Sequence, residues 1–132
     1  ANDLQAIGFS SADVGGENLK HLGNLTGLHE IMIRLAIVTD ADVQAIKPLT
    51  DLREISFSRT SITDEGFANF EAFKQLRRLE LGSAKLTNAS INTLRKFQFL
   101  EYLDLDGNTG VTRETLIRLR ATLKDCEIAG ID

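Results

Sequence analysis

Three polar residues near the C-terminal end of the chain come closest to a ligand-binding motif. Asp104, Asp106 and Asn108 alternate in the segment DLDGN, as oxygen ligands do at the start of a calcium-binding loop. Such a loop also needs glycine at its sixth position and glutamate at its twelfth, where this chain has Thr109 and Thr115. We therefore interpret the segment as the end of a strand that turns through Gly107 and Asn108, and we expect no metal site there.

The residues that most often act in catalysis are few and scattered. The two histidines, His21 and His29, have no ligand pattern around them and no evident nucleophile to activate. Cys126, the single cysteine, stands in an apolar position of the pattern described below, so we expect a buried side chain rather than a nucleophile. Gly15 and Gly16 lack the Lys-Ser/Thr that follows in a phosphate-binding loop. The sequence therefore predicts neither an enzyme nor a cofactor or metal.

The composition is that of an ordinary globular domain. The chain has 132 residues, of which 42% are apolar and 26% charged, and this length suits one core, so we expect a single domain over residues 1–132. A net charge of −4 disfavours nucleic acid as a partner, because clustered cations are needed to neutralise phosphates. The longest apolar run, residues 35–38, is too short to span a membrane. Nothing in the sequence indicates a cellular compartment.

A 24-residue repeat dominates the sequence. Its first position is leucine five times in succession, at Leu4, Leu28, Leu52, Leu76 and Leu100. Apolar residues follow three and five positions after each leucine, and a sixth, closing copy consists of Leu123, Cys126 and Ile128. The last two members of each triplet alternate with polar residues, a pattern that predicts a short strand in every repeat.

A helical pattern follows each of the first five predicted strands, and from the second repeat onward a threonine precedes it. That position is held by Thr39, Thr63, Thr87 and Thr112. A threonine hydroxyl there can cap a helix, and Asp40 and Asp64 suit the positive end of its dipole. Apolar residues then recur every three positions, as in Phe67, Phe70 and Phe73, which predicts one buried stripe per helix.

Units of this kind cannot bury their apolar faces alone, so the repeats must stack into a solenoid. Stacking produces a parallel sheet on one curved side and a layer of helices on the other, and the crossover rule makes the coil right-handed. The predicted fold class is therefore α/β, with six parallel strands and five helices. The repeats start near residues 4, 28, 52, 76 and 100, and a terminal strand covers 123–128.

This pattern resembles the leucine-rich repeats, in the short form L-x-x-L-x-L-x-x-T-x-I-T-D-x-G-L. Residues 52–67, LREISFSRTSITDEGF, match that motif almost throughout, and the other repeats match with more drift. The chain is similar to the GALA-like and cysteine-containing subclasses of the family. Because the cysteine of the latter subclass is absent, the bacterial members, notably those of planctomycetes, resemble this chain more. The resemblance implies a protein-recognition scaffold that uses its concave strand face, and it implies no catalytic residues.

The residues between the triplet positions should line that concave face. In-register stacking places Glu54, Arg78 and Tyr102 side by side in one column. A second column brings Glu80, Asp104 and Glu127 together, with Asp106 nearby, although like charges side by side cost stability. These seven residues are the predicted partner-binding site: Glu54, Arg78, Glu80, Tyr102, Asp104, Asp106 and Glu127.

Two interpretations of this face remain open. In the functional one, the carboxylates receive a basic partner and Tyr102 is its aromatic anchor. In the other, the face is merely solvated, and its charge is partly balanced by Arg77, Lys124 and cross-strand pairs such as Glu54–Arg78.

We expect a non-enzymatic module that binds a protein or peptide on the concave strand face, where the carboxylates favour a basic partner. The alternative is a structural segment of a larger array. Only three residues precede the first triplet, so we expect the first strand edge to be bare, and a bare edge invites self-association through the solenoid ends.

Overall fold

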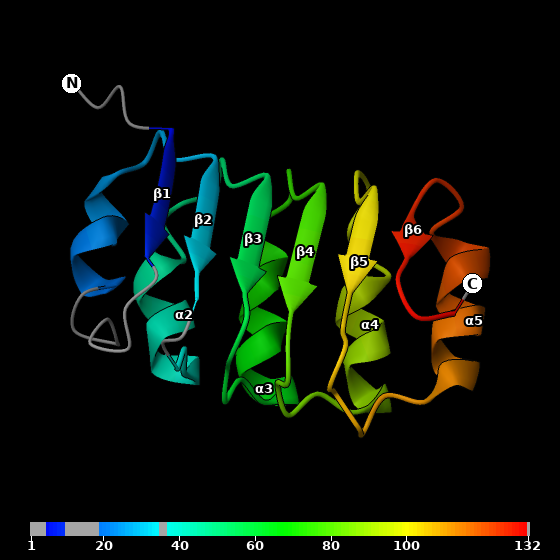
Figure 1. Cartoon of the computed structure of the whole chain (residues 1–132). Helices are drawn as coiled ribbons and strands as arrows, with labels where there is room; N and C mark the ends of the chain where they lie inside the picture. Colours follow the sequence, from blue (N-terminus) through cyan, green and yellow to red (C-terminus); the bar gives the residue numbers. More distant parts are fainter. Residues whose placement is uncertain (1–4, 10–18, 35–36, 132) are drawn as a thin grey trace.

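The protein folds into a single coil of strand–helix turns, as a computed structural model shows (Figure 1). The structure describes residues 5–9, 19–34 and 37–131. Leu4, Gly15 and Gly16 lie outside these residues. Six strands form one parallel sheet in chain order: β1 (Ala6–Phe9), β2 (Glu30–Ile33), β3 (Glu54–Phe57), β4 (Arg78–Leu81), β5 (Tyr102–Asp104) and β6 (Glu127–Ile128). The coil is right-handed (Figure 1), so the predicted α/β solenoid is confirmed.

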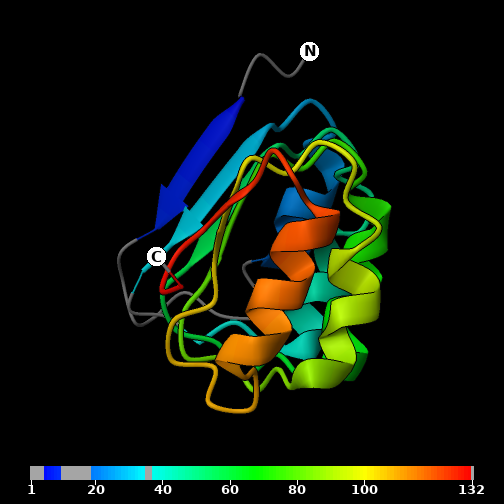
Figure 2. The same cartoon turned by 90° about the vertical axis from the view of Figure 1, so that its right-hand side faces the viewer.

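The helical segments are short and partly of the tighter 3₁₀ kind. They are η1 (Lys20–Asn24), α2 (Asp40–Ile46), α3 (Asp64–Phe67), η2 (Ala68–Ala72), η3 (Asn88–Ser90), α4 (Ile91–Leu94) and α5 (Arg113–Thr122). All of them lie on one side of the sheet, so the molecule has two layers (Figure 2). None of the helices in the described residues is long and apolar enough to cross a membrane.

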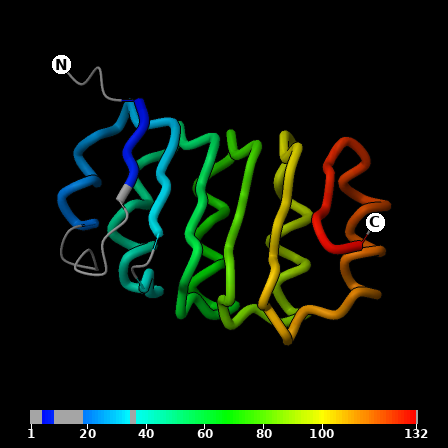
Figure 3. Tube along the Cα trace, in the orientation of Figure 1, coloured from blue at the N-terminus to red at the C-terminus, as the bar shows by residue number. Residues whose placement is uncertain are grey.

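The 24-residue spacing sets the register of the first five strands. Ile31 pairs with Ile55, Ile55 with Leu79, and Leu79 with Leu103, each 24 residues apart. These four side chains are at most 1% exposed, since each points into the space between the sheet and the helices. The Cα trace in Figure 3 shows the resulting even stack of turns.

The helix stripes fill the other side of the core, as predicted. Phe67, Phe70 and Phe73 are fully buried, and the ring centroids of Phe67 and Phe70 lie 4.8 Å apart. Phe97 of the next repeat meets Phe67 edge-on at 6.3 Å. These aromatic side chains are core, with their helical spacing fully explained by packing.

The threonines cap the helices, as predicted, and they also tie consecutive repeats together. Thr63 caps α3 by accepting a hydrogen bond from the Gly66 N–H. Thr63 also donates its own backbone N–H to Asp40 Oδ1 at 2.9 Å and its hydroxyl to Asp40 Oδ2 at 2.7 Å. Thr87 donates to Asp64 in the same two ways. The Thr-Asp pairs of consecutive repeats therefore form a ladder of hydrogen bonds, which runs along the side of the coil where the strands have their carboxyl ends.

Candidate functional site

The outward side of the sheet is the candidate binding surface. Its outward-pointing side chains from β2 to β6 are Glu30, Met32, Glu54, Ser56, Arg78, Glu80, Tyr102, Asp104 and Glu127. We call these nine residues the strand face. They comprise five carboxylates and one guanidinium, a formal charge of −4. The acidic character that the sequence predicted for this face is therefore present in the structure.

The predicted neighbours of one site residue were wrong. Glu127 pairs with Tyr102, and Ile128 with Leu103, so the offset to the last strand is 25 residues rather than 23. The physical reason is the extra residue in the turn of the fifth repeat, which moves β6 by one position relative to the 24-residue spacing. Glu127 consequently stands beside Tyr102 rather than beside Asp104. The predicted column of three carboxylates contains two, Glu80 and Asp104.

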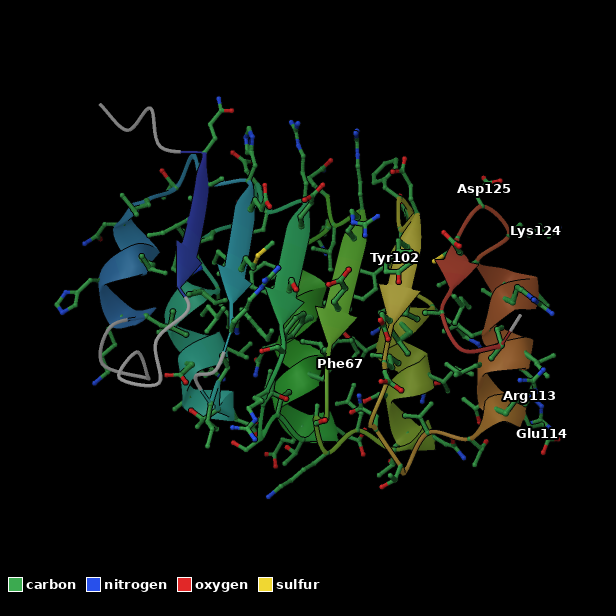
Figure 4. All side chains as sticks on the ribbon, in the orientation of Figure 1. Phe67, Tyr102, Arg113, Glu114, Lys124 and Asp125 are labelled. Atoms are coloured by element: carbon green, nitrogen blue, oxygen red, sulfur yellow. The ribbon has the colours of Figure 1, made fainter. Side chains whose placement is uncertain are left out.

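Lys124 and Asp125 occupy the loop that precedes β6, at the amino-end side of the sheet (Figure 4). Asp125 was expected in the strand column that holds Tyr102, and the register of β6 gives that place to Glu127 instead. Both loop residues are exposed.

Arg78 makes contacts other than those predicted. Its guanidinium carbon lies 4.3 Å from the centroid of the Tyr102 ring, and its Nη2 lies 3.3 Å from Glu80 Oε1. The predicted ion pair with Glu54 is not among those of the described residues, because the guanidinium stacks toward β5 instead. A guanidinium over a tyrosine face is attracted by the negative charge of the ring face.

Glu80 is held by two neighbours at once. The Ser56 hydroxyl donates to Glu80 Oε2 at 2.9 Å across β3 and β4, while Arg78 contacts the other oxygen. A side chain fixed by two partners loses little further conformational freedom when a ligand binds. Glu80 is therefore the best-positioned carboxylate of the strand face.

The surroundings of Tyr102 disfavour negative charge. Burial raises the pKa of its phenol above 10.0, the carboxylates of Asp104, Glu80 and Glu127 raise it further, and Arg78 opposes them. Three carboxylates thus act on this ring against one guanidinium. The same field that opposes a phenolate attracts a cation.

Two depressions flank the carboxylates at the carboxyl end of β5. One, of about 310 Å³, is lined by residues that include Arg34, Ser58, Glu80, Asp104 and Asp106. The other, of about 480 Å³, also borders Asp104 and Asp106 but extends to Arg113 at the start of α5 and to Gly130. Asp104 and Asp106 therefore stand on the ridge between two hollows.

The second hollow was missed by the sequence analysis. It lies where the extra residue of the fifth repeat changes the offset of β6, and its lining includes Asn108, Ala129 and Gly130. The signal that could have revealed it is the irregular spacing after Leu100.

The residues that resemble a calcium loop serve the fold. Asn108 is 4% exposed, and its amide donates to the carbonyls of Leu81 and Leu105 at 2.7 and 2.9 Å. Its Oδ1 accepts from the Leu86 N–H at 3.2 Å. Asp104 Oδ1 accepts from the backbone N–H of Asp106. Among the described residues, no group of three or more His, Cys, Asp or Glu side chains could hold a metal ion.

The other chemically reactive side chains are separated from one another. His21 is exposed on η1, and His29 lies directly before β2. Cys126 is buried, and burial, together with the charge of Glu127, raises the pKa of its thiol to about 11. A thiol with so high a pKa is almost entirely protonated at neutral pH and is a poor nucleophile.

Parallel strands that alternate with short helices in an open, in-register stack define an α/β solenoid. No protein-family model and no curated protein matches the sequence. Among solved structures, a leucine-rich-repeat protein of Leptospira interrogans has a similar fold, with a TM-score of 0.59 and 24% sequence identity. The match covers 83% of this chain and 27% of that one, so this chain spans about a quarter of that protein's length. The fold is the leucine-rich-repeat fold.

Proposed function

We propose that this protein is a non-enzymatic interaction module that binds a protein or peptide on its strand face. The observation that carries the proposal is the set of carboxylates near Tyr102 that lack a cationic partner. Among the described residues the ion pairs are Arg78–Glu80, Lys96–Glu71 and Arg118–Glu114. Asp104, Asp106 and Glu127 take part in none of these pairs.

A surface with this charge pattern suits a basic partner. Unpaired carboxylates steer a cationic ligand toward the sheet and favour it over neutral competitors. The hollows on either side of Asp104 and Asp106 offer room for side chains that project from an extended peptide. Tyr102 supplies the aromatic contact that often dominates the binding energy of an interface.

The experiment is a selection of peptides from a randomised phage-displayed library against the immobilised protein. The affinity of the selected peptide is then measured for two double variants. Glu80→Lys/Asp104→Lys reverses two charges on the strand face. Glu65→Lys/Glu114→Lys reverses two exposed charges on the helical layer and is the matched control.

The proposal predicts that the strand-face variant binds the selected peptide at least about tenfold more weakly, since each reversed contact replaces attraction by repulsion. The control variant should bind within about twofold of the wild type, and high salt should weaken the wild-type complex. Equal effects of the two variants would contradict the proposal.

A structural role within a larger array is the alternative, and one observation favours it. Ile7 of β1 is only partly buried, whereas its counterparts Ile31, Ile55 and Leu79 are at most 1% exposed. Because β1 pairs with β2 alone in the described sheet, its other edge is open to a further strand.

The mass of the protein in solution, measured by light scattering, distinguishes this structural role from peptide binding on the strand face. Gln5 directs its carbonyl to β2, so the alternation of a strand directs the N–H and C=O of Gly8 to the free edge. If copies pair through this edge, light scattering should give a dimer, and Gly8→Pro should convert it to a monomer. A wild-type monomer at high concentration would contradict pairing between copies.

A further inference from the structure

The strand face already holds one guanidinium, and it comes from the protein itself. Arg78 places that group over the Tyr102 ring and against Glu80, so the aromatic and acidic contacts that an arginine ligand needs are both present. Glu80 is oriented for this role by Ser56. Tyr102 and Glu80 thus form a small arginine-binding site, and in the free protein the side chain of Arg78 occupies it.

This internal contact is weakly held. The side chains of Arg78 and Glu80 are 46% and 38% exposed, so water competes for both partners. Exposed ion pairs and exposed cation–π contacts are each worth little, and a competing guanidinium can replace them. Arg78 is free to swing away because its long side chain lies on the outside of the sheet.

The charge balance around the ring favours a further guanidinium. Asp104 and Glu127 act on Tyr102 in addition to Glu80, and Arg78 is the cation that opposes them. Glu127 stands directly across from Tyr102 on β6, and Asp104 is two residues further along β5. An incoming arginine therefore meets carboxylates on two sides of the ring.

We infer that the strand face binds an arginine side chain of its partner at Tyr102, and that Arg78 occupies the place of that arginine in the free protein. This inference rests on the proposed function and specifies the chemistry of the partner: a basic peptide segment with at least one accessible arginine. A guanidinium is planar, stacks on an aromatic face and can contact two carboxylate oxygens at once, whereas the ammonium of lysine cannot do all three.

The chain carries its own probe for this site. Tyr102 is the single tyrosine and there is no tryptophan, so tyrosine emission from the protein comes from this ring alone. The test peptides are acetyl-(Gly-Arg)₄-amide and two analogues in which every arginine is replaced by lysine or by citrulline. Citrulline keeps the shape of arginine and removes its charge. Binding is followed by Tyr102 fluorescence and by calorimetry.

Two variants distinguish the displacement of Arg78 by a ligand arginine from the mere loss of one positive charge. Arg78→Ala empties the ring face and releases Glu80, while Arg77→Ala removes an equal charge from an exposed neighbour at the amino-end side of β4. We expect Arg78→Ala to bind the arginine peptide about three- to tenfold more tightly than wild type, because no internal contact has to be broken. Arg77→Ala should change the affinity by less than about twofold, since it removes only an exposed and screened charge.

The arginine peptide should also bind more tightly than the lysine peptide, and the citrulline peptide should not bind measurably. The inference is overturned if Arg78→Ala binds the arginine peptide no more tightly than Arg77→Ala does, or if citrulline replaces arginine without loss. In either event a library-selected peptide that still depends on Glu80 and Asp104 would leave the proposed function standing. If that peptide also ignores the strand face, both proposals fail together.

Discussion

The carboxylate of Asp40 fills the space next to Gly66 in which a larger residue would place its side chain. A β-carbon built on Gly66 would overlap the carboxylate of Asp40, which lies there to accept the two hydrogen bonds of Thr63. In the next repeat the equivalent position is Ser90, whose hydroxyl donates to Asp64. The Thr, Asp and Gly of the motif therefore act as one unit that joins each repeat to its neighbour.

Gly66→Ala should destabilise the protein by about 2 kcal/mol, because the new methyl group displaces Asp40 from Thr63. Asp40→Ala alone should cost about 1–3 kcal/mol for the lost hydrogen bonds. With Asp40 already replaced, Gly66→Ala should be neutral or stabilising by up to about 1 kcal/mol, since alanine favours a helix. Urea unfolding of the two single variants and the double variant measures this coupling. Additive effects of the two changes would show that the residues do not act as a unit.

The free energy of unfolding should depend on pH through Asp64, whose carboxylate accepts hydrogen bonds in this ladder. Burial raises the pKa of this carboxyl, but the hydrogen bonds from Ser90 and Thr87 outweigh it and leave the pKa below 3.8. A lowered folded-state pKa contributes stability that is complete above the unfolded-state value and is lost as the pH falls through the folded-state value. Asp64→Asn should therefore show a smaller loss of unfolding free energy between about pH 5 and pH 2 than the wild type. Asp51→Asn, which removes one carboxylate at an exposed position, is the matched control for the change in net charge. A loss in Asp64→Asn equal to that of the wild type would contradict the role of Asp64.

The ionisation of Tyr102 reports on the charges of the strand face. Because it is the single tyrosine, the absorbance of tyrosinate gives its pKa directly, and that pKa should lie above 10.0. Asp104→Asn should lower it by removing a negative neighbour, and Arg78→Ala should raise it by removing the opposing cation. Since the folded state favours the neutral phenol, stability should decrease as the pH rises through this pKa. An unchanged pKa in both variants would place the two charges too far from the ring to matter.

Asn108 should be a stability residue rather than a metal ligand. Asn108→Ala leaves the Leu81 carbonyl and the Leu86 N–H without their buried partner, and it removes one of the two hydrogen bonds that the Leu105 carbonyl accepts from Asn108. We therefore expect a loss of about 3 kcal/mol in unfolding free energy. Added calcium should leave the Tm of the wild type unchanged, because the amide is already engaged. A rise in Tm with calcium, absent in Asp104→Asn, would contradict this assignment.

The repeat spacing was sufficient to predict the fold because it determines burial directly. Leucine or another apolar residue every 24 positions can be buried only if the repeats stack in register, and the pairs Ile31–Ile55 and Ile55–Leu79 follow from that. The helix caps could be predicted because they depend on local sequence alone: a threonine directly before a helical stripe caps the helix, as Thr39 and Thr63 do.

The contacts between neighbouring side chains were less predictable. The partner of Arg78 depends on the direction in which its long side chain turns. The guanidinium turns toward the Tyr102 ring on β5 rather than toward Glu54 on β3. The position of Glu127 depends on where one extra residue is accommodated, which the spacing of the triplets does not determine. The hydrogen bonds between Asp40 and Thr63 cross a repeat boundary, so the sequence pattern of a single helix does not predict them.

The most direct test of the central claim is to map the binding surface by NMR. The library-selected peptide is titrated into isotopically labelled protein, and the backbone amide shifts are followed. We expect the largest changes on β3 to β6, around Glu80, Tyr102 and Asp104, and we expect them to disappear in Glu80→Lys/Asp104→Lys. Changes that concentrate instead on α2 to α5, and that persist in that variant, would contradict it.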